Sequence, residues 1–139
     1  MEEEEFRRLA TDYAAAWCSQ DPLRVASFYE ESASLTINGG PPARGRAAIA
    51  TEARSFMTAF PNLRVTFDDL EFNGDEMRFH WTLTGTNSGP SGTGRFVEIS
   101  GYEDWQISEN GLIANSLGHF DSEDYERQLG GAPPDGGLL

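Results

Sequence analysis

The sequence contains a single cysteine, Cys18, and lacks any long hydrophobic run. One cysteine cannot form an internal disulfide or a cysteine-based metal motif. Because its neighbours at helical spacing are apolar, we expect Cys18 to be a buried, unreactive thiol. No apolar stretch reaches the length of a membrane span, and the acidic N-terminus is unlike a signal peptide. These absences predict a soluble, cytoplasmic protein.

Basic residues are also scarce, since 10 arginines and lysines stand against 23 acidic residues and give a net charge of −13. A negative field of this size repels phosphate backbones and anionic membrane surfaces, so neither nucleic acid nor a membrane is an expected partner. The two histidines are too few, and too far from carboxylates at helical spacing, to predict a metal site. The glycine-containing loop 85–94 has no lysine and no following helix, so it is not a phosphate loop. No Ser-His-Asp or Cys-His signature is present.

The chain does have a clear change of hydrophobic period. Apolar residues recur every three or four positions in its first half and at every second position in its second half, which is typical of helices followed by strands. Asp21 and Pro22 are a typical helix start. The predicted helices are 3–19, 22–31 and 46–60. The predicted strands are 34–38, 63–72, 77–86, 95–107 and 112–121, with a final helical turn at 122–129.

The order α-α-β-α-β-β-β-β predicts the α+β class. We expect residues 1–130 to form one domain in which a curved, cone-shaped antiparallel sheet is covered by the N-terminal helices. The concavity between these two layers is a usual place for a small-molecule pocket. The Gly- and Pro-rich segment 131–139 is expected to be a flexible tail.

Several short segments, taken together with the order in which they occur along the chain, resemble the sequence motifs of one family. They are 45–49 (Gly-Arg-Ala-Ala-Ile), 60–63 (Phe-Pro-Asn-Leu), 84–86 (Thr-Gly-Thr), 92–95 (Gly-Thr-Gly-Arg), 109–113 (Glu-Asn-Gly-Leu-Ile), 120–121 (Phe-Asp) and 128–130 (Gln-Leu-Gly). Over residues 5–130 the chain resembles the SnoaL-like polyketide cyclases, within the nuclear-transport-factor-like and ketosteroid-isomerase-like superfamily. The resemblance implies a cystatin-like α+β barrel, a homodimer, a deep apolar pocket and no cofactor.

The resemblance also implies a candidate catalytic residue. The family's cyclases use an acidic residue late in the chain as the acid/base of an intramolecular aldol closure, and Asp121 occupies the matching place. The chain has Asn87 where members often have His, and His80 where they often have Arg. Segment 34–38 offers no carboxylate of the ketosteroid isomerase kind, and 78–80 reads Arg-Phe-His instead of the Arg-x-Asp of related epoxide hydrolases. Neither of those chemistries is therefore predicted.

The alternation of the last predicted strand places His119 and Asp121 on one face, together with Ile113, Asn115 and Leu117. This face is typical of a pocket wall that is apolar along most of its length and becomes polar at His119 and Asp121. An apolar pocket would raise the pKa of Asp121 towards the working pH and suit it to acid/base catalysis, with His119 tuning or relaying the proton. In the alternative interpretation, Asp121 caps the following helical turn.

Other candidates come from the middle strands and the aromatic residues. His80 shares a face with Arg78 and the threonines of 77–86, and is either a catalytic group or an ordinary sheet or interface histidine. Six aromatic side chains could form the walls of a pocket for a flat substrate, or belong to an ordinary core. These predicted substrate-binding residues are Tyr13, Trp17, Phe28, Phe56, Trp81 and Trp105, with Asn115 as a further polar contact.

The leading functional hypothesis is a cofactor-independent cyclase- or isomerase-like enzyme that acts on a small hydrophobic carbonyl compound. Asp121 would move the proton, His119 would assist it, and His80 or Asn115 would stabilise the oxyanion. The alternative hypothesis is a non-catalytic module of the same fold that binds a small ligand or serves dimerisation. The direction of the Asp121 side chain would favour one over the other.

Overall fold

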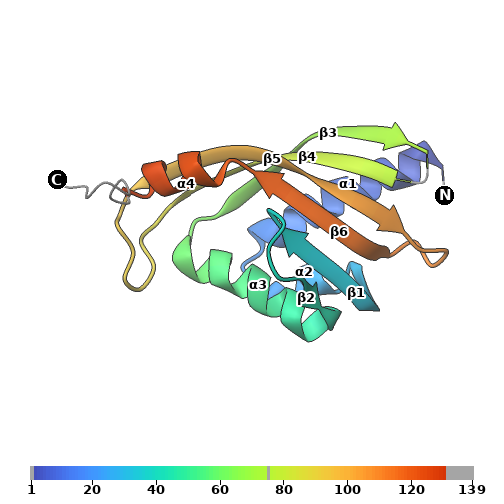
Figure 1. The fold of residues 1–139 in the computed structure, drawn as a ribbon, viewed down its shortest axis with the longest axis horizontal. Coiled ribbons are helices and arrows are strands. Elements are labelled where there is room, and N and C mark those ends of the chain that lie inside the picture. Colours follow the sequence, from blue (N-terminus) through green and yellow to red (C-terminus); the bar gives the residue numbers. More distant parts are fainter. Residues whose placement is uncertain (1, 75, 131–139) are drawn as a thin grey trace.

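A computed structural model describes residues 2–74 and 76–130, and it shows one curved sheet with helices on its concave side (Figure 1). The predicted tail 131–139 lies outside the described residues. In the part of the chain that is described, none of the helices is long and apolar enough to cross a membrane. The α+β class predicted from the sequence is confirmed.

Side chains at the start of α1 and α2 satisfy free backbone N–H groups. In α1 (Glu3–Cys18), Glu2 and Glu5 form a reciprocal capping box. In α2 (Pro22–Ala26), the Asp21 carboxylate accepts a hydrogen bond from the Leu23 N–H at 3.1 Å, and proline occupies the first turn. The remaining two helices are α3 (Gly45–Ala59) and α4 (Ser122–Gln128).

The strands form one sheet in the order β2-β1-β6-β5-β4-β3. Their bounds are β1 (Tyr29–Ile37), β2 (Ala43–Arg44), β3 (Arg64–Asn73), β4 (Glu76–Thr86), β5 (Phe96–Ile107) and β6 (Ile113–Phe120). β1 pairs with β6 in parallel, whereas all the other pairings are antiparallel, so the sheet is mixed instead of wholly antiparallel. β1 also begins five residues before the predicted strand, and the two-residue β2 was not predicted.

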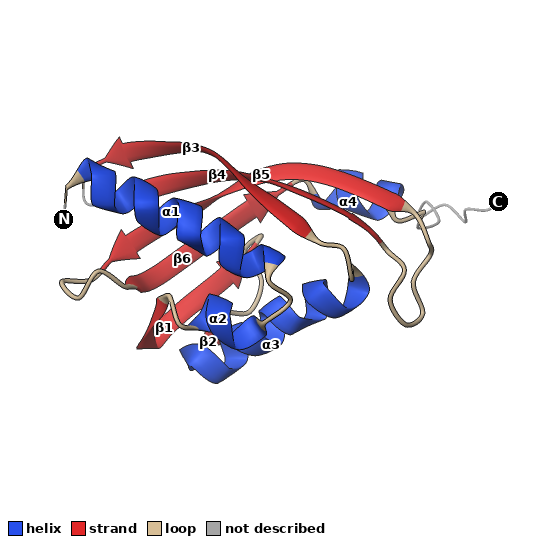
Figure 2. Ribbon diagram, turned by 180° about the vertical axis from the view of Figure 1, so that it is seen from behind, coloured by secondary structure: helices blue, strands red, loops and turns tan. Residues whose placement is uncertain are grey.

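Helices α1, α2 and α3 pack on the inner face of the sheet (Figure 2). Alternation along β4 turns Met77, Phe79 and Leu83 inward, where they are buried. The same alternation along β5 turns Val97 and Trp105 inward. The opposite, outer face of the sheet carries most of the polar residues of these strands. The core and any enclosed site therefore lie between the inner face and the helices.

Gly101 makes room for a large side chain on the neighbouring strand. It pairs with Trp81 of β4, and a Cβ atom at this position would lie 2.7 Å from the indole and 2.2 Å from the His119 carbonyl oxygen. We expect Gly101→Ala to lower the free energy of unfolding by about 1–3 kcal/mol, because the backbone of β6 must move to relieve the overlap. Urea denaturation measures this change.

Gly118→Ala is the matched control for that substitution. Gly118 is a buried glycine on β6, and a Cβ there would meet the Glu103 side chain at an ordinary contact distance of 3.6 Å. The control should therefore cost much less. If both variants lose the same free energy of unfolding, the close contacts around Gly101 are not the reason that glycine is required there.

Candidate active site

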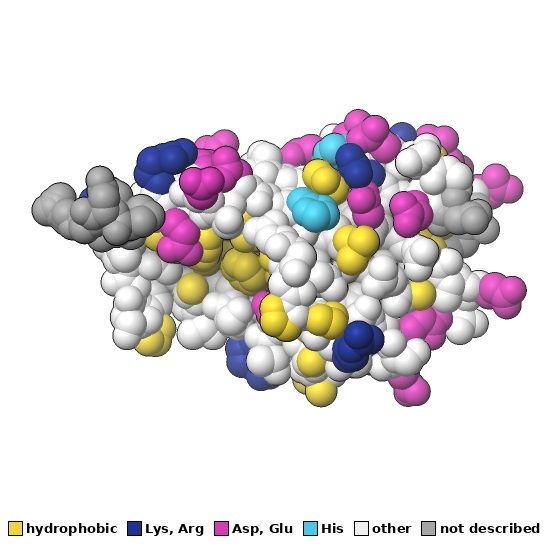
Figure 3. Space-filling view, in the orientation of Figure 1, with side chains coloured by type: hydrophobic (Ala, Val, Ile, Leu, Met, Phe, Trp, Pro, Cys, Tyr) yellow, Lys and Arg dark blue, Asp and Glu magenta, His cyan; other side chains and the backbone are white. Residues whose placement is uncertain are grey.

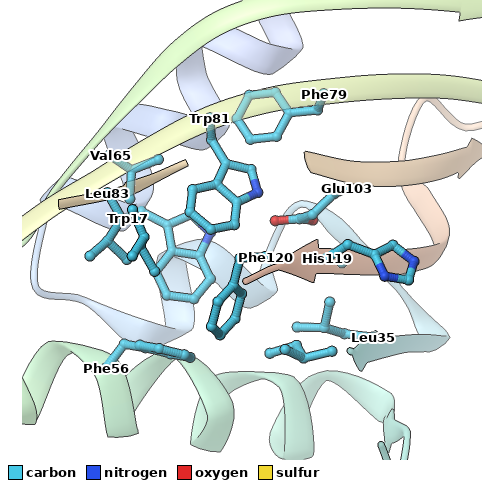
Figure 4. A pocket seen from close by; sticks show the side chains of 13 residues that line it. Trp17, Leu35, Phe56, Val65, Phe79, Trp81, Leu83, Glu103, His119 and Phe120 are labelled. Carbon is cyan, nitrogen blue, oxygen red and sulfur yellow. The ribbon is translucent and has the colours of Figure 1, made fainter. Parts of the chain in front are cut away.

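A mainly apolar cavity lies between the sheet and the helices (Figure 4). Its volume is about 60 Å³. Figure 3 shows apolar side chains in a hollow on the face that it displays. The aromatic lining residues are Trp17, Phe56, Phe79, Trp81 and Phe120, and the aliphatic ones are Leu35, Ile37, Val65, Leu83 and Ile99.

One carboxyl group, that of Glu103, lines this cavity, and only 8% of the residue is exposed. Its Oε1 accepts hydrogen bonds from Ser116 Oγ at 2.7 Å and from Trp105 Nε1 at 2.9 Å. The Tyr13 hydroxyl lies 3.1 Å from Oε1, and the Tyr29 hydroxyl lies 3.4 Å from it. Among residues 2–74 and 76–130, Oε2 has a single neighbour of this kind, the Tyr13 hydroxyl at 3.3 Å. One carboxyl oxygen is thus fixed by several donors while the other is largely free.

The environment of Glu103 changes its acidity. Burial raises the pKa of its carboxyl above the ordinary value, because the charged form loses its hydration. The hydrogen bonds from Trp105, Ser116 and the two tyrosines oppose this shift. The balance favours the neutral acid more than water does, which suits the group to receive and return a proton near neutral pH.

Tyr13 and Tyr29 form the other half of this network. Their hydroxyl oxygens lie 2.7 Å apart, and both side chains are fully buried. Burial, followed by the nearby charge of Glu103, raises the pKa of both hydroxyls well above the ordinary value. The two tyrosines therefore stay neutral. One hydroxyl donates its proton to the other, and the second hydroxyl donates its own to the Glu103 carboxyl.

The Asp121 carboxylate is directed to the start of α4. It is exposed, and its Oδ1 accepts a hydrogen bond from the Asp124 N–H at 3.0 Å as the N-cap of this helix. Asp121 is not one of the residues that line the cavity. The geometry matches the capping interpretation of Asp121, and its catalytic role stays an untested prediction.

The predicted polar wall on β6 lies on the outer face of the sheet. Ile113 is buried, but the register shifts beside it, between Gln106 and Ile107 of the neighbouring strand. Such an irregularity reverses which residues point inward. Ser116 and Gly118 face the core as a result, in place of the residues on either side of them.

The predicted polar residues consequently lie apart from Glu103. His119 borders the cavity, but its side chain is exposed and its ring centroid lies 5.1 Å from that of Tyr102. Asn115 accepts a hydrogen bond from Ser34 Oγ at 2.7 Å. His80 lies on the outer side of β4, where its Nε2 contacts the Glu71 carboxylate. The structure does not bring these three side chains together around one ligand position.

The predicted aromatic residues are much closer to the cavity. Trp17, Phe56 and Trp81 line it. Tyr13 and Trp105 contact the carboxyl of Glu103, as described above. The sixth residue, Phe28, packs edge-on against the ring of Tyr13, with centroids 5.7 Å apart, and is not a lining residue. Substrate binding by these residues stays a prediction.

Glu103 itself was not among the predicted residues. The sequence does contain a signal for it. Every second residue from Val97 to Trp105 is apolar or glycine, except for the carboxylate at position 103. Within residues 2–74 and 76–130, no group of three or more His, Cys, Asp or Glu side chains is placed to hold an ion.

A sheet curved around a pocket and covered by helices defines the ketosteroid-isomerase-like class of folds, and solved structures agree. A hypothetical protein of this fold from Catenulispora acidiphila DSM 44928, in complex with trimethylamine, matches with a TM-score of 0.79 at 17% identity, over 91% of this chain and 95% of that one. TsrD from Streptomyces laurentii also matches with a TM-score of 0.79, at 22% identity over 94% and 98% of the two chains.

A family model identifies one family within this class. The model of the SnoaL-like polyketide cyclase family matches residues 7–129, and the chain belongs to this family. A putative SnoaL-like polyketide cyclase from Jannaschia sp. CCS1 matches with a TM-score of 0.76 at 15% identity, over 94% of this chain and 92% of that one. A search of curated protein sequences returns no significant match.

Proposed function

We propose that this protein is a cofactor-independent enzyme of the cyclase or isomerase type, in which the Glu103 carboxyl moves a proton on a small hydrophobic carbonyl compound. The observation that supports this role most strongly is the Glu103 carboxyl itself. It is buried beside an apolar cavity, its Oε1 is held by donors, and its Oε2 has one neighbour at 3.3 Å. Membership of the SnoaL-like family is consistent with this class of reaction.

The chemistry starts from the ionised form of Glu103. Oε2 takes a proton from the carbon next to the substrate carbonyl, and the electron pair of the broken C–H bond forms the enolate. The neutral acid then returns the proton to another carbon, which is an isomerisation. Alternatively, the enolate carbon attacks a second carbonyl of the same molecule, and the acid protonates the alkoxide, which is an aldol closure. Burial makes the carboxylate a stronger base than in water.

Proton exchange tests this proposal without knowledge of the natural substrate. Small cyclic ketones such as cyclopentanone are incubated with the protein in D₂O, and loss of the Cα–H signal is followed by ¹H NMR. We expect exchange above the buffer rate. Exchange at the buffer rate for a panel of ketones small enough for the cavity would contradict an acid/base function on carbonyl compounds.

A second candidate function is the binding of a small ligand without chemistry. Aromatic side chains surround a single carboxyl in the cavity, an arrangement that suits an organic cation. The protein from Catenulispora acidiphila that shares the fold was solved in complex with trimethylamine. A cation would bind the ionised form of Glu103, so its affinity would increase as pH rises through the pKa of this group. Tight amine binding without ketone exchange would favour this candidate.

We further propose that the chain forms a homodimer through the outer face of the sheet. Leu117 on this face is 40% exposed, and the Arg78 guanidinium lies 3.9 Å from the centroid of the Tyr102 ring beside it. Figure 3 shows the two histidines on the displayed surface close to apolar side chains. A second copy of the chain would cover these groups.

Sedimentation equilibrium tests the dimer. We expect a mass of about twice the 15.3 kDa chain at micromolar concentration, and a shift towards the monomer in Leu117→Arg, because a buried unpaired charge is strongly unfavourable. Leu23→Arg is the control, since Leu23 is 67% exposed on α2, on the other side of the sheet. A monomeric native protein would contradict the proposal.

A further inference from the structure

Trp81 carries a buried hydrogen-bond donor that no protein group satisfies. Its indole Nε1 is the one buried side-chain polar atom without a hydrogen-bond partner in residues 2–74 and 76–130. Nearly all buried polar groups in proteins have a partner, so an exception calls for an explanation. An indole N–H can donate but cannot accept, and the missing partner must therefore be an acceptor.

The indole is held in place from two sides. Gly101, directly opposite on β5, has no side chain, and a Cβ atom there would lie 2.7 Å from the ring. The Phe120 ring packs edge-on against Trp81, with centroids 6.1 Å apart. The direction of the N–H is therefore set by packing before any ligand arrives.

This N–H faces the same cavity as the proposed acid/base. Trp81 and Glu103 both line the cavity, on neighbouring strands. In Figure 4 the nitrogen-bearing edge of the indole is turned towards the side of the cavity where the Glu103 carboxyl lies. The Trp81 N–H and the largely free Oε2 of Glu103 therefore both face one cavity that is otherwise apolar.

We propose that Trp81 Nε1–H binds the carbonyl oxygen of the substrate and thereby presents the adjacent carbon to Glu103 Oε2. This inference rests on the proposed function and adds to it the group that recognises the ligand. The same hydrogen bond strengthens when the carbonyl oxygen acquires negative charge in the enolate, so the donor stabilises the transition state more than the ground state. The site then selects small ligands with an acceptor oxygen over hydrocarbons and amines of the same shape.

Binding of shape-matched probes tests the selection. Cyclopentanone and methylenecyclopentane share the same ring and differ only in the exocyclic group, which is an oxygen in the ketone and a CH₂ in the alkene. We expect the ketone to bind roughly tenfold more tightly, as one hydrogen bond to a buried donor allows. In ¹H–¹⁵N spectra, the Trp81 indole signal should move on addition of the ketone and much less on addition of the alkene.

An isosteric change at residue 81 separates the N–H from the volume of the ring. Benzothienylalanine, introduced at position 81 by stop-codon suppression, replaces the N–H by sulfur and also identifies the Trp81 signal by its disappearance. The ketone preference should fall to about one, while alkene binding stays unchanged as the internal control. No ketone preference in the native protein, including failure of both probes to bind, overturns the proposal, as does a preference that survives the substitution.

The two proposals can fail separately. Proton exchange that depends on Glu103, together with an unresponsive Trp81 signal, would overturn the role of Trp81 and leave the proposed function standing. A Trp81-dependent ketone preference without exchange would support the binding site and contradict the catalytic function. Tighter binding of trimethylamine than of the ketone would overturn the role of Trp81 as the selecting group.

Discussion

Glu103→Gln is expected to abolish most of the ketone proton exchange, with a loss of about 10²–10⁴-fold. The amide has nearly the same shape and its oxygen can still accept from Ser116 and Trp105, which lie 2.7 and 2.9 Å from Oε1. It cannot take up a proton near neutral pH, however, and therefore cannot act as the base. The rate of Cα–H loss in D₂O, with native and variant protein at equal concentration, measures the difference.

The control for this substitution is Glu98→Gln, which makes the same change on the exposed side of β5. It should leave the exchange rate within about twofold of the native rate. If Glu103→Gln also keeps most of the rate, the proton is moved by another group. Asp121→Asn is then the next variant, because asparagine caps a helix as well as aspartate does and changes only the acid/base chemistry.

Much of the fold could be predicted because its signals are local. Asp21 and Pro22 specify a helix start by their own hydrogen bonding and φ preference, and the observed α2 begins there. The alternation of the later strands locates them within one or two residues of their observed ends. The exception is the beginning of β1. The apolar residues of 22–31 have helical spacing and predict a helix to residue 31, whereas in the structure β1 begins at Tyr29. Burial of this tyrosine against Tyr13 and Glu103 is a tertiary effect that helical spacing cannot reveal.

The candidate site could be predicted only in part because it depends on distant contacts. Glu103 meets the Tyr13 hydroxyl across 90 positions of sequence, and no local pattern joins the two. The register of β6 shifts beside Ile113. A regular alternation from Ile113 therefore placed Asn115, Leu117 and His119 on the inner face, whereas Ser116 and Gly118 are the buried residues. The aromatic residues were easier to predict, because large apolar side chains on α1 and the inner face of a strand are buried in almost any packing.

The pH dependence of stability should distinguish Glu103 from an ordinary surface carboxylate. Burial raises its folded pKa above the unfolded value, which is near 4.5. The fold therefore favours the neutral acid, and the stability linked to this group is complete below pH 4.5 and is lost as pH rises through the folded pKa. The loss can reach about 1.4 kcal/mol for each pH unit between the two pKa values. Glutamine carries no such proton, so Glu103→Gln removes this loss.

The difference between the two proteins isolates this effect, since their other 22 acidic residues are shared. The free energy of unfolding of both proteins is measured by urea denaturation from pH 4 to pH 9. The value for the glutamine variant minus the value for the native protein should increase as pH rises and then level off. The plateau begins near the folded pKa of Glu103, which the experiment thereby measures. A variant that instead loses stability relative to the native protein with rising pH would mean that the hydrogen bonds from Ser116, Trp105 and the tyrosines outweigh burial. The folded pKa would then be lowered, and Glu103 would be a structural anion instead of an acid/base.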